Sequence, residues 1–198
     1  MPRATVPPLW RTVSIATQTF QLFNLEHPQI IARIIDDIDA GVNVYYDRRW
    51  TVTERFCRFL LDQPAWVADR SILILGAGLG LETLVIGRLC KSLYINDLAP
   101  AAIELCERQL RQNNITDFIC LPGRYETLEL PPVDLVVGCF LIYNRETAAA
   151  MRQFLQRCTT PVLLINDNMP ILHRFIRATS RSHRSLLPPD DDPCILFT

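Results

Sequence analysis

Three of the seven glycines in this chain fall together, at Gly76, Gly78 and Gly80. The apolar run 71–75 precedes them, and a segment with helical periodicity, 80–90, follows. A buried strand that enters a glycine-rich turn and then a helix presents backbone N–H groups at its carboxyl end, where open α/β sheets bind their ligands. The sequence therefore predicts a ligand-binding turn at 76–80.

Short apolar runs alternate with amphipathic segments through the rest of the chain. The runs are continuous rather than alternating, which indicates strands that are buried on both faces of a mainly parallel sheet. The predicted fold class is α/β, with a doubly wound, mainly parallel, Rossmann-like sheet. The expected strands are 71–75, 92–96, 118–121, 133–140 and 162–166, and the expected helices are 80–90, 99–113, about 145–158 and one that begins near Pro170.

The segment before the first of these strands is predicted to be helical. Isoleucines at 30, 31, 34, 35 and 38 recur at helical spacing and give this helix one apolar face, and Gly41 fits the position just after its end. A second helix is expected over about 53–62, with Phe56, Phe59 and Leu60 facing inward.

We expect one domain, 1–198. Residues 1–64 would form a helical lid and substrate region, 65–180 the cofactor-binding core and 181–198 a tail. The tail has one short apolar stretch, CILFT, so it is expected to supply one edge strand rather than a full hairpin.

Composition excludes several classes of protein. The 198 residues carry 20 basic and 21 acidic side chains, so the basic excess that nucleic-acid binding requires is missing. No apolar run approaches the roughly 20 residues of a membrane span, and residues 1–20 show no secretory signal. We therefore expect a cytoplasmic protein with neither nucleic acid nor membrane as its partner. The seven cysteines and three histidines lack metal-ligand spacing, which predicts reduced, buried thiols and no metal.

The acid at the end of the second expected strand points to an adenosine-containing ligand. Asp97 is placed to accept hydrogen bonds from the two hydroxyls of a ribose. The dinucleotide motif needs a third glycine at position 81, where this chain has Leu81, so a pyrophosphate would have to approach across a leucine side chain. The spacing therefore favours S-adenosylmethionine over NAD, and a nicotinamide-dependent reductase remains the less favoured alternative.

Residues 45–169 resemble the class I, or seven-strand, adenosylmethionine-dependent methyltransferases, and within them the small protein-lysine methyltransferases. The resemblance rests on YYDRRW (45–50), ILILGAGLG (72–80), INDLAP (95–100) and DLVVGCFLIYN (134–144). It implies the methyltransferase fold and places Trp50 near the cofactor. The expected cofactor-binding residues are Trp50, Gly76, Ala77, Gly78, Gly80, Asp97, Leu98 and Cys139.

Two departures from the family affect the methyl-transfer end of the expected site. Ile74 replaces the acid that usually stands two residues before the first glycine, and Phe140 replaces the acid of the family's D-x-x-Y segment, whose Tyr143 is kept. Phe140 and Tyr143 could together hold a cation through their ring faces, or Phe140 could simply be a core residue.

Methyl transfer from a sulfonium needs alignment and exclusion of water more than a fixed acid or base. The residues expected to act at the target are Tyr143 and Asp167, at the carboxyl ends of the fourth and fifth strands. Asp167 could accept a proton from an amine, or it could only cap the following helix. The predicted reaction is protein-lysine N-methylation, with a protein lysine as the partner. The alternatives are methylation of a small molecule and a non-catalytic module that binds the cofactor or a partner.

Overall fold

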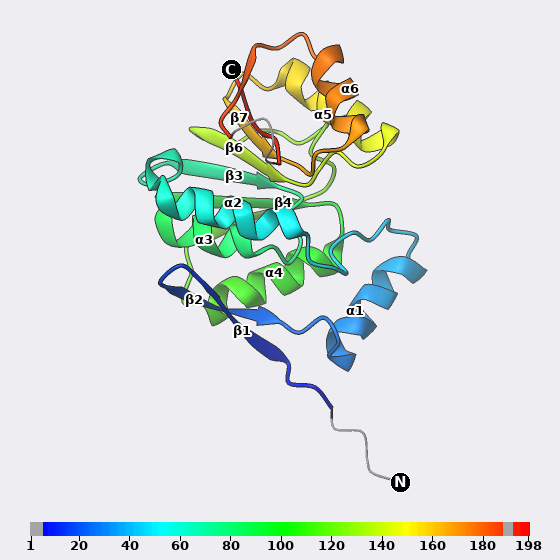
Figure 1. The fold of residues 1–198 in the computed structure, drawn as a ribbon. Coiled ribbons are helices and arrows are strands. Elements are labelled where there is room, and N and C mark those ends of the chain that lie inside the picture. Colours follow the sequence, from blue (N-terminus) through cyan, green and yellow to red (C-terminus); the bar gives the residue numbers. More distant parts are fainter. Residues whose placement is uncertain (1–5, 188–191) are drawn as a thin grey trace.

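The computed structural model describes residues 6–187 and 192–198. Residues 1–5, where the segment examined for a secretory signal begins, lie outside this range. Within it, no helix is both long and apolar enough to cross a membrane. Figure 1 shows one central sheet with helices on both of its faces and a separate small hairpin near the N-terminus.

The sheet has seven strands in the order β5-β4-β3-β6-β7-β9-β8, and its first five are parallel. β9 runs antiparallel to β7, and β8 antiparallel to β9. The five predicted strands are therefore confirmed, as is the doubly wound, mainly parallel sheet. The strands are β3 (Ser71–Leu75), β4 (Ser92–Asp97), β5 (Phe118–Pro122), β6 (Leu135–Cys139), β7 (Val162–Ile165), β8 (His183–Ser185) and β9 (Cys194–Phe197).

The side chains of alternate residues in the central strands pack into two separate apolar clusters, one on each face of the sheet. On β3, Ile72 and Ile74 pack on the side of α2, α3 and α4, whereas Leu73 and Leu75 pack on the side of α5 and α6. Burial on both faces is why these strands read as continuous apolar runs. The helices are α2 (Thr51–Asp62), α3 (Leu81–Leu89), α4 (Pro100–Gln112), α5 (Arg145–Arg157) and α6 (Pro170–Ala178), and a 3-10 turn, η1, spans Pro64–Trp66.

The N-terminal region is not wholly helical, because it begins with an antiparallel hairpin that the sequence did not predict. β1 (Trp10–Ile15) pairs with β2 (Gln18–Phe23), and the hairpin lies on the outer side of the helices that cover the sheet (Figure 1). Two side chains of the α4 region hold β2: the Gln109 carbonyl oxygen accepts from the Phe23 N–H at 2.9 Å, and that of Asn113 from the Gln21 N–H at 2.8 Å.

The two predicted N-terminal helices are confirmed. α1 (Pro28–Asp39) has Ala40 as its C-cap, and Gly41 follows with φ +77°, as expected after a helix end. Its apolar stripe is wider than the face it buries, since Ile30 and Ile34 are buried while the isoleucines at 31, 35 and 38 are 42 to 54% exposed. In α2, the three residues expected to face inward, 56, 59 and 60, are all buried.

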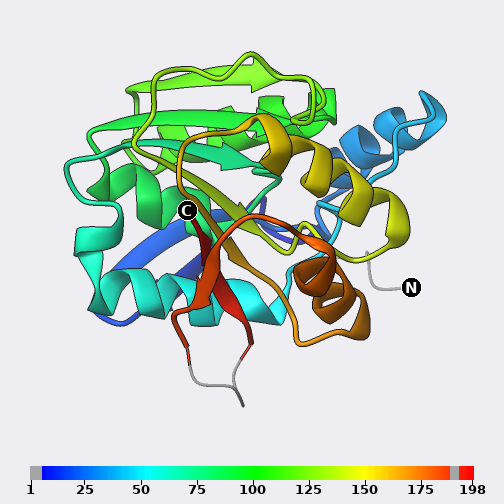
Figure 2. The ribbon, with the colours of Figure 1, turned by 90° about the horizontal axis from the view of Figure 1, so that it is seen from above.

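The prediction for the tail was wrong, because its described residues form two paired antiparallel strands, β8 and β9, rather than one edge strand. β9 is buried between β7 and β8, and all four of its side chains are buried. β8 is the edge strand, and its three residues are exposed. A short strand of exposed polar residues carries no apolar signal, which is why the sequence did not reveal β8. Figure 2 shows these two strands side by side near the C-terminus.

Candidate functional site

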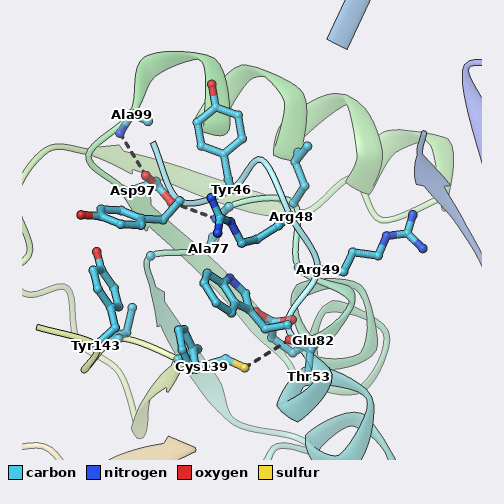
Figure 3. A pocket seen from close by; sticks show the side chains of 18 of the residues that line it. Tyr46, Arg48, Arg49, Thr53, Ala77, Glu82, Asp97, Ala99, Cys139 and Tyr143 are labelled. Carbon is cyan, nitrogen blue, oxygen red and sulfur yellow. Dashed lines mark hydrogen bonds between the residues drawn. The ribbon is translucent and has the colours of Figure 1, made fainter. Parts of the chain in front are cut away.

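A cavity of about 530 Å³ lies at the carboxyl ends of β3, β4 and β6 (Figure 3). The chain order in the sheet reverses between β3 and β6, so the loops that follow these two strands separate there. Residues 43–54, which lead into α2, and three hairpin side chains close the cavity from the other side. Its volume lies within the range of sites that bind small organic molecules.

The glycine turn needs its glycines for two different reasons. Gly76 and Gly78 have φ +58° and +47°, a left-handed conformation that favours glycine. A Cβ atom on Gly76 would also lie 2.6 Å from Leu141 Cδ2. Gly80 has ordinary backbone angles, with φ −69°, but a Cβ atom there would overlap the Glu82 carboxyl group. Gly80 is therefore needed because it leaves space for the Glu82 side chain, and not because of its backbone angles.

Asp97 ties the glycine turn to the end of β4. One carboxylate oxygen accepts the Gly78 N–H at 2.9 Å, and the other accepts the Ala99 N–H at 2.9 Å. Burial raises the pKa of Asp97, and these N–H groups counteract part of that rise. Each oxygen keeps a lone pair for a further donor, and the residue lines the cavity.

One part of the cavity lining is aromatic. Trp50, just before α2, stacks on Phe140, which follows β6, with ring centroids 3.9 Å apart. Tyr143 lies 4.3 Å from Tyr45 between centroids and is nearly parallel to Phe140 at 6.0 Å. Phe140 is buried and also lines the cavity, so it belongs both to the core and to the site. Burial, aided by Tyr45, raises the pKa of Tyr143, which keeps its phenol neutral.

One buried amide fixes the loop that carries this aromatic wall. The Asn166 side chain accepts the Ile142 N–H at 3.0 Å and donates to the Ile142 carbonyl at 2.8 Å. We expect Asn166→Ala to leave both backbone groups without these partners and to lower the free energy of unfolding by about 2 to 3 kcal/mol. Urea denaturation measures this. The control variant is Asn168→Ala, which loses only an exposed hydrogen bond to His173. Asn114 is also exposed but makes a poorer control, because its φ of +60° means that the substitution would also change the backbone strain.

The structure brings together nine of the ten residues singled out from the sequence. All eight expected cofactor-binding residues line the cavity, and so does Tyr143. Asp167 is not part of the lining that the described residues form; burial and the nearby Asp192 raise its pKa, and Arg55 lowers it. Cys139 lies 3.5 Å from Thr53 Oγ1, and burial raises the pKa of its thiol.

The cysteines and acids of the described chain form no metal site. All seven cysteines fall within it as free thiols, of which Cys90 and Cys120 are half-buried and the rest buried. Over residues 6–187 and 192–198, no group of three or more His, Cys, Asp or Glu side chains is placed to hold a metal ion.

Sequence reasoning missed Glu82, the second residue of α3. It is 4% exposed and lines the cavity, and burial raises the pKa of its carboxyl group to about 7. The available signal was an acid in the apolar segment LETLVIG directly after the glycine turn. A charged residue in an otherwise buried helix needs a partner or a ligand.

Curated relatives cover part of this chain. It is 27% identical over 118 residues to the electron transfer flavoprotein beta subunit lysine methyltransferase of Danio rerio, and 28% identical over 116 residues to that of Homo sapiens. Each match covers 58% of this chain, but only 45% and 44% of the relative. The chain thus spans less than half the length of the curated relatives it matches. No family model matches the sequence.

Solved structures match over a longer part of the chain. A T. thermophilus 16S rRNA N2 G1207 methyltransferase, in complex with AdoMet and guanosine, gives a TM-score of 0.66 at 17% identity and covers 98% of this chain and 52% of its own. The chain has the class I methyltransferase fold. A putative methyltransferase from Pseudomonas syringae shares this fold, with a TM-score of 0.57 at 15% identity over 73% of this chain and 98% of its own. The methyltransferase fold places the cavity described above at the carboxyl edge of its sheet.

Proposed function

We propose that this protein is an S-adenosylmethionine-dependent methyltransferase. The observation that carries the proposal is a single cavity, in a methyltransferase fold, lined by the glycine turn, by Asp97 and by Trp50. The lining fits the cofactor, because two of its buried oxygens, Glu82 Oε2 and Asn96 Oδ1, have no hydrogen-bond partner among the described residues. Adenosylmethionine supplies a methyl group on a sulfonium. The sulfur leaves as a neutral thioether, so the leaving group needs little further activation.

The residues of the cavity would divide the binding of this cofactor between them. The Asp97 carboxylate, already oriented by the N–H groups of Gly78 and Ala99, has lone pairs left for the ribose hydroxyls. The glycine turn lines the cavity and would lie along the cofactor's methionine part. The stacked rings of Trp50 and Phe140 would shield the reacting atoms from water, which favours transfer to the substrate over side reactions.

We further propose a protein lysine as the methyl acceptor. The support is the match to lysine methyltransferases over 58% of the chain, together with the aromatic wall, whose ring faces suit a cationic or amine side chain. The neutral phenol of Tyr143 can hydrogen-bond a target amine and orient its lone pair. Asp167 is left without a role in this proposal because it does not line the cavity.

Thermal unfolding tests the cofactor proposal. We expect adenosylmethionine and adenosylhomocysteine to raise the midpoint and NAD to leave it unchanged, since a ligand at 100 times its dissociation constant adds roughly 2.7 kcal/mol to stability. A shift with NAD alone would support the nicotinamide-dependent alternative. If none of the three ligands shifts the midpoint, the cofactor proposal is contradicted, and the non-catalytic, partner-binding module becomes the favoured alternative.

The acceptor is tested with radiolabelled adenosylmethionine and cell lysate. We expect label in protein bands, with loss of that label when the lysines of the lysate are acylated beforehand. A ribonuclease-treated sample is needed because an RNA methyltransferase shares the fold. Label that ribonuclease removes would contradict both the protein acceptor and the expected absence of a nucleic-acid partner. Label confined to a low-molecular-weight filtrate would point to the small-molecule alternative.

A further inference from the structure

The Glu82 carboxyl group lies directly over the glycine turn. A Cβ atom built on Gly80 would be 2.2 Å from Glu82 Oε1 and 2.3 Å from Oε2, so the carboxyl group occupies the space that the missing side chain leaves. Figure 3 shows Glu82 beside Thr53 and Cys139, with Ala77 between this group and Asp97. The Glu82 carboxyl group therefore lies at Gly80, the end of the glycine turn, whereas Asp97 holds the turn at Gly78.

Glu82 differs from Asp97 and Glu126 in having a buried carboxyl oxygen without a hydrogen-bond partner among the described residues. Both oxygens of Asp97 accept backbone N–H groups, and Glu126 accepts from Arg124 at 2.6 Å. Glu82 Oε2 is buried and has no hydrogen-bond partner among residues 6–187 and 192–198. A buried carboxylate without a partner is costly, and a bound cationic group would remove that cost.

We propose that the Glu82 carboxylate binds the α-ammonium group of the methionine part of adenosylmethionine. This inference rests on the proposed cofactor. With Asp97, which holds Gly78, taking the ribose, the methionine part would run along the turn toward Gly80, where the Glu82 carboxyl group lies. Ile74, at the end of β3, supplies no charge there, since its side chain is apolar and fully buried. Glu82, on α3, would thus provide the negative charge that β3 does not provide.

Isothermal titration of Glu82→Gln with two ligands tests this inference. Adenosylhomocysteine carries the α-ammonium group, and 5′-methylthioadenosine lacks the whole amino-acid part. We expect Glu82→Gln to weaken adenosylhomocysteine by roughly 10- to 100-fold, the range for loss of a charge-assisted hydrogen bond, and to change methylthioadenosine by less than about twofold. Adenosylmethionine should weaken as much as adenosylhomocysteine does.

Each other outcome overturns the proposal in a distinguishable way. Unchanged adenosylhomocysteine affinity would remove Glu82 from the cofactor site, and equal loss of both ligands would make its role structural. Weakening of adenosylmethionine alone would assign the carboxylate to the sulfonium instead. If the unaltered protein binds none of the three ligands, the proposed function itself fails, before Glu82 is in question.

Two further variants separate the charge from the fold. Gly80→Ala demands no unusual backbone angle, but its Cβ atom must displace the flexible Glu82 carboxyl group. We expect the same selective loss of adenosylhomocysteine affinity from a protein that still folds, as checked by circular dichroism. Glu107→Gln removes an exposed acid on α4 that pairs with Arg111, and both affinities should remain within about twofold of the unaltered protein.

Discussion

Replacement of Asp97 by asparagine is expected to damage both the fold and the cofactor site. The two carboxylate oxygens accept N–H groups from Gly78 and Ala99. An asparagine has only one oxygen, so one of these N–H groups would face the side-chain NH₂ group, which also donates. Loss of one such bond in a buried site should lower the free energy of unfolding by about 1 to 3 kcal/mol.

The same substitution should weaken adenosylhomocysteine by at least roughly 10-fold, because the amide donates where the proposed ribose contact needs an acceptor. Chemical denaturation and isothermal titration measure the two effects. Asp117→Asn changes an exposed acid just before β5 and should alter neither. An Asp97→Asn protein that retains its affinity would exclude Asp97 from the ribose site.

The sequence predicted the elements whose burial leaves a clear pattern. β3 and β7 read as unbroken apolar runs because both of their faces are covered. The hairpin β1–β2 has no such pattern, since it packs on one face against helices and its Arg11 and Thr12 are exposed. β8 consists of three exposed residues and is defined only by its pairing with β9.

The site was predictable where the order of adjacent parallel strands sets the geometry. The glycine turn and Asp97 meet because the carboxyl ends of adjacent parallel strands lie at the same edge, so their order in the chain was enough. The stack of Trp50 on Phe140 joins residues far apart in the sequence, and only the packing of α2 on the sheet determines it. The absence of Asp167 from the cavity lining likewise depends on how the chain turns after β7, which apolar periodicity does not report.

Glu82 should make the ligand-free protein lose stability as the pH rises. Burial raises the pKa of its carboxyl group from 4.5 to about 7, so the folded state binds this proton more tightly than the unfolded state does. The resulting stabilisation is fully present below pH 4.5 and is lost as the pH rises through about 7. The total is about 3 kcal/mol, of which about 2 kcal/mol falls between pH 5.5 and 8.5.

Glu82→Gln removes this titration, so comparison of the two proteins isolates it from the other shifted acids, Asp97 and Asp167. Urea denaturation without ligand at several pH values should show the variant gaining about 2 kcal/mol relative to the unaltered protein from pH 5.5 to 8.5. Parallel profiles would mean that the carboxyl group does not titrate in this range.

A residue that serves only to stabilise α3 would show the opposite pattern, with the variant less stable and no selective change in ligand affinity. A variant that is more stable at high pH yet binds adenosylhomocysteine less tightly is the behaviour of a functional group held in an unfavourable environment. The same burial that destabilises the ionised carboxylate in the free protein strengthens its attraction for an incoming ammonium group, because little water competes for either charge. The stability and affinity measurements therefore test one physical cause from two sides.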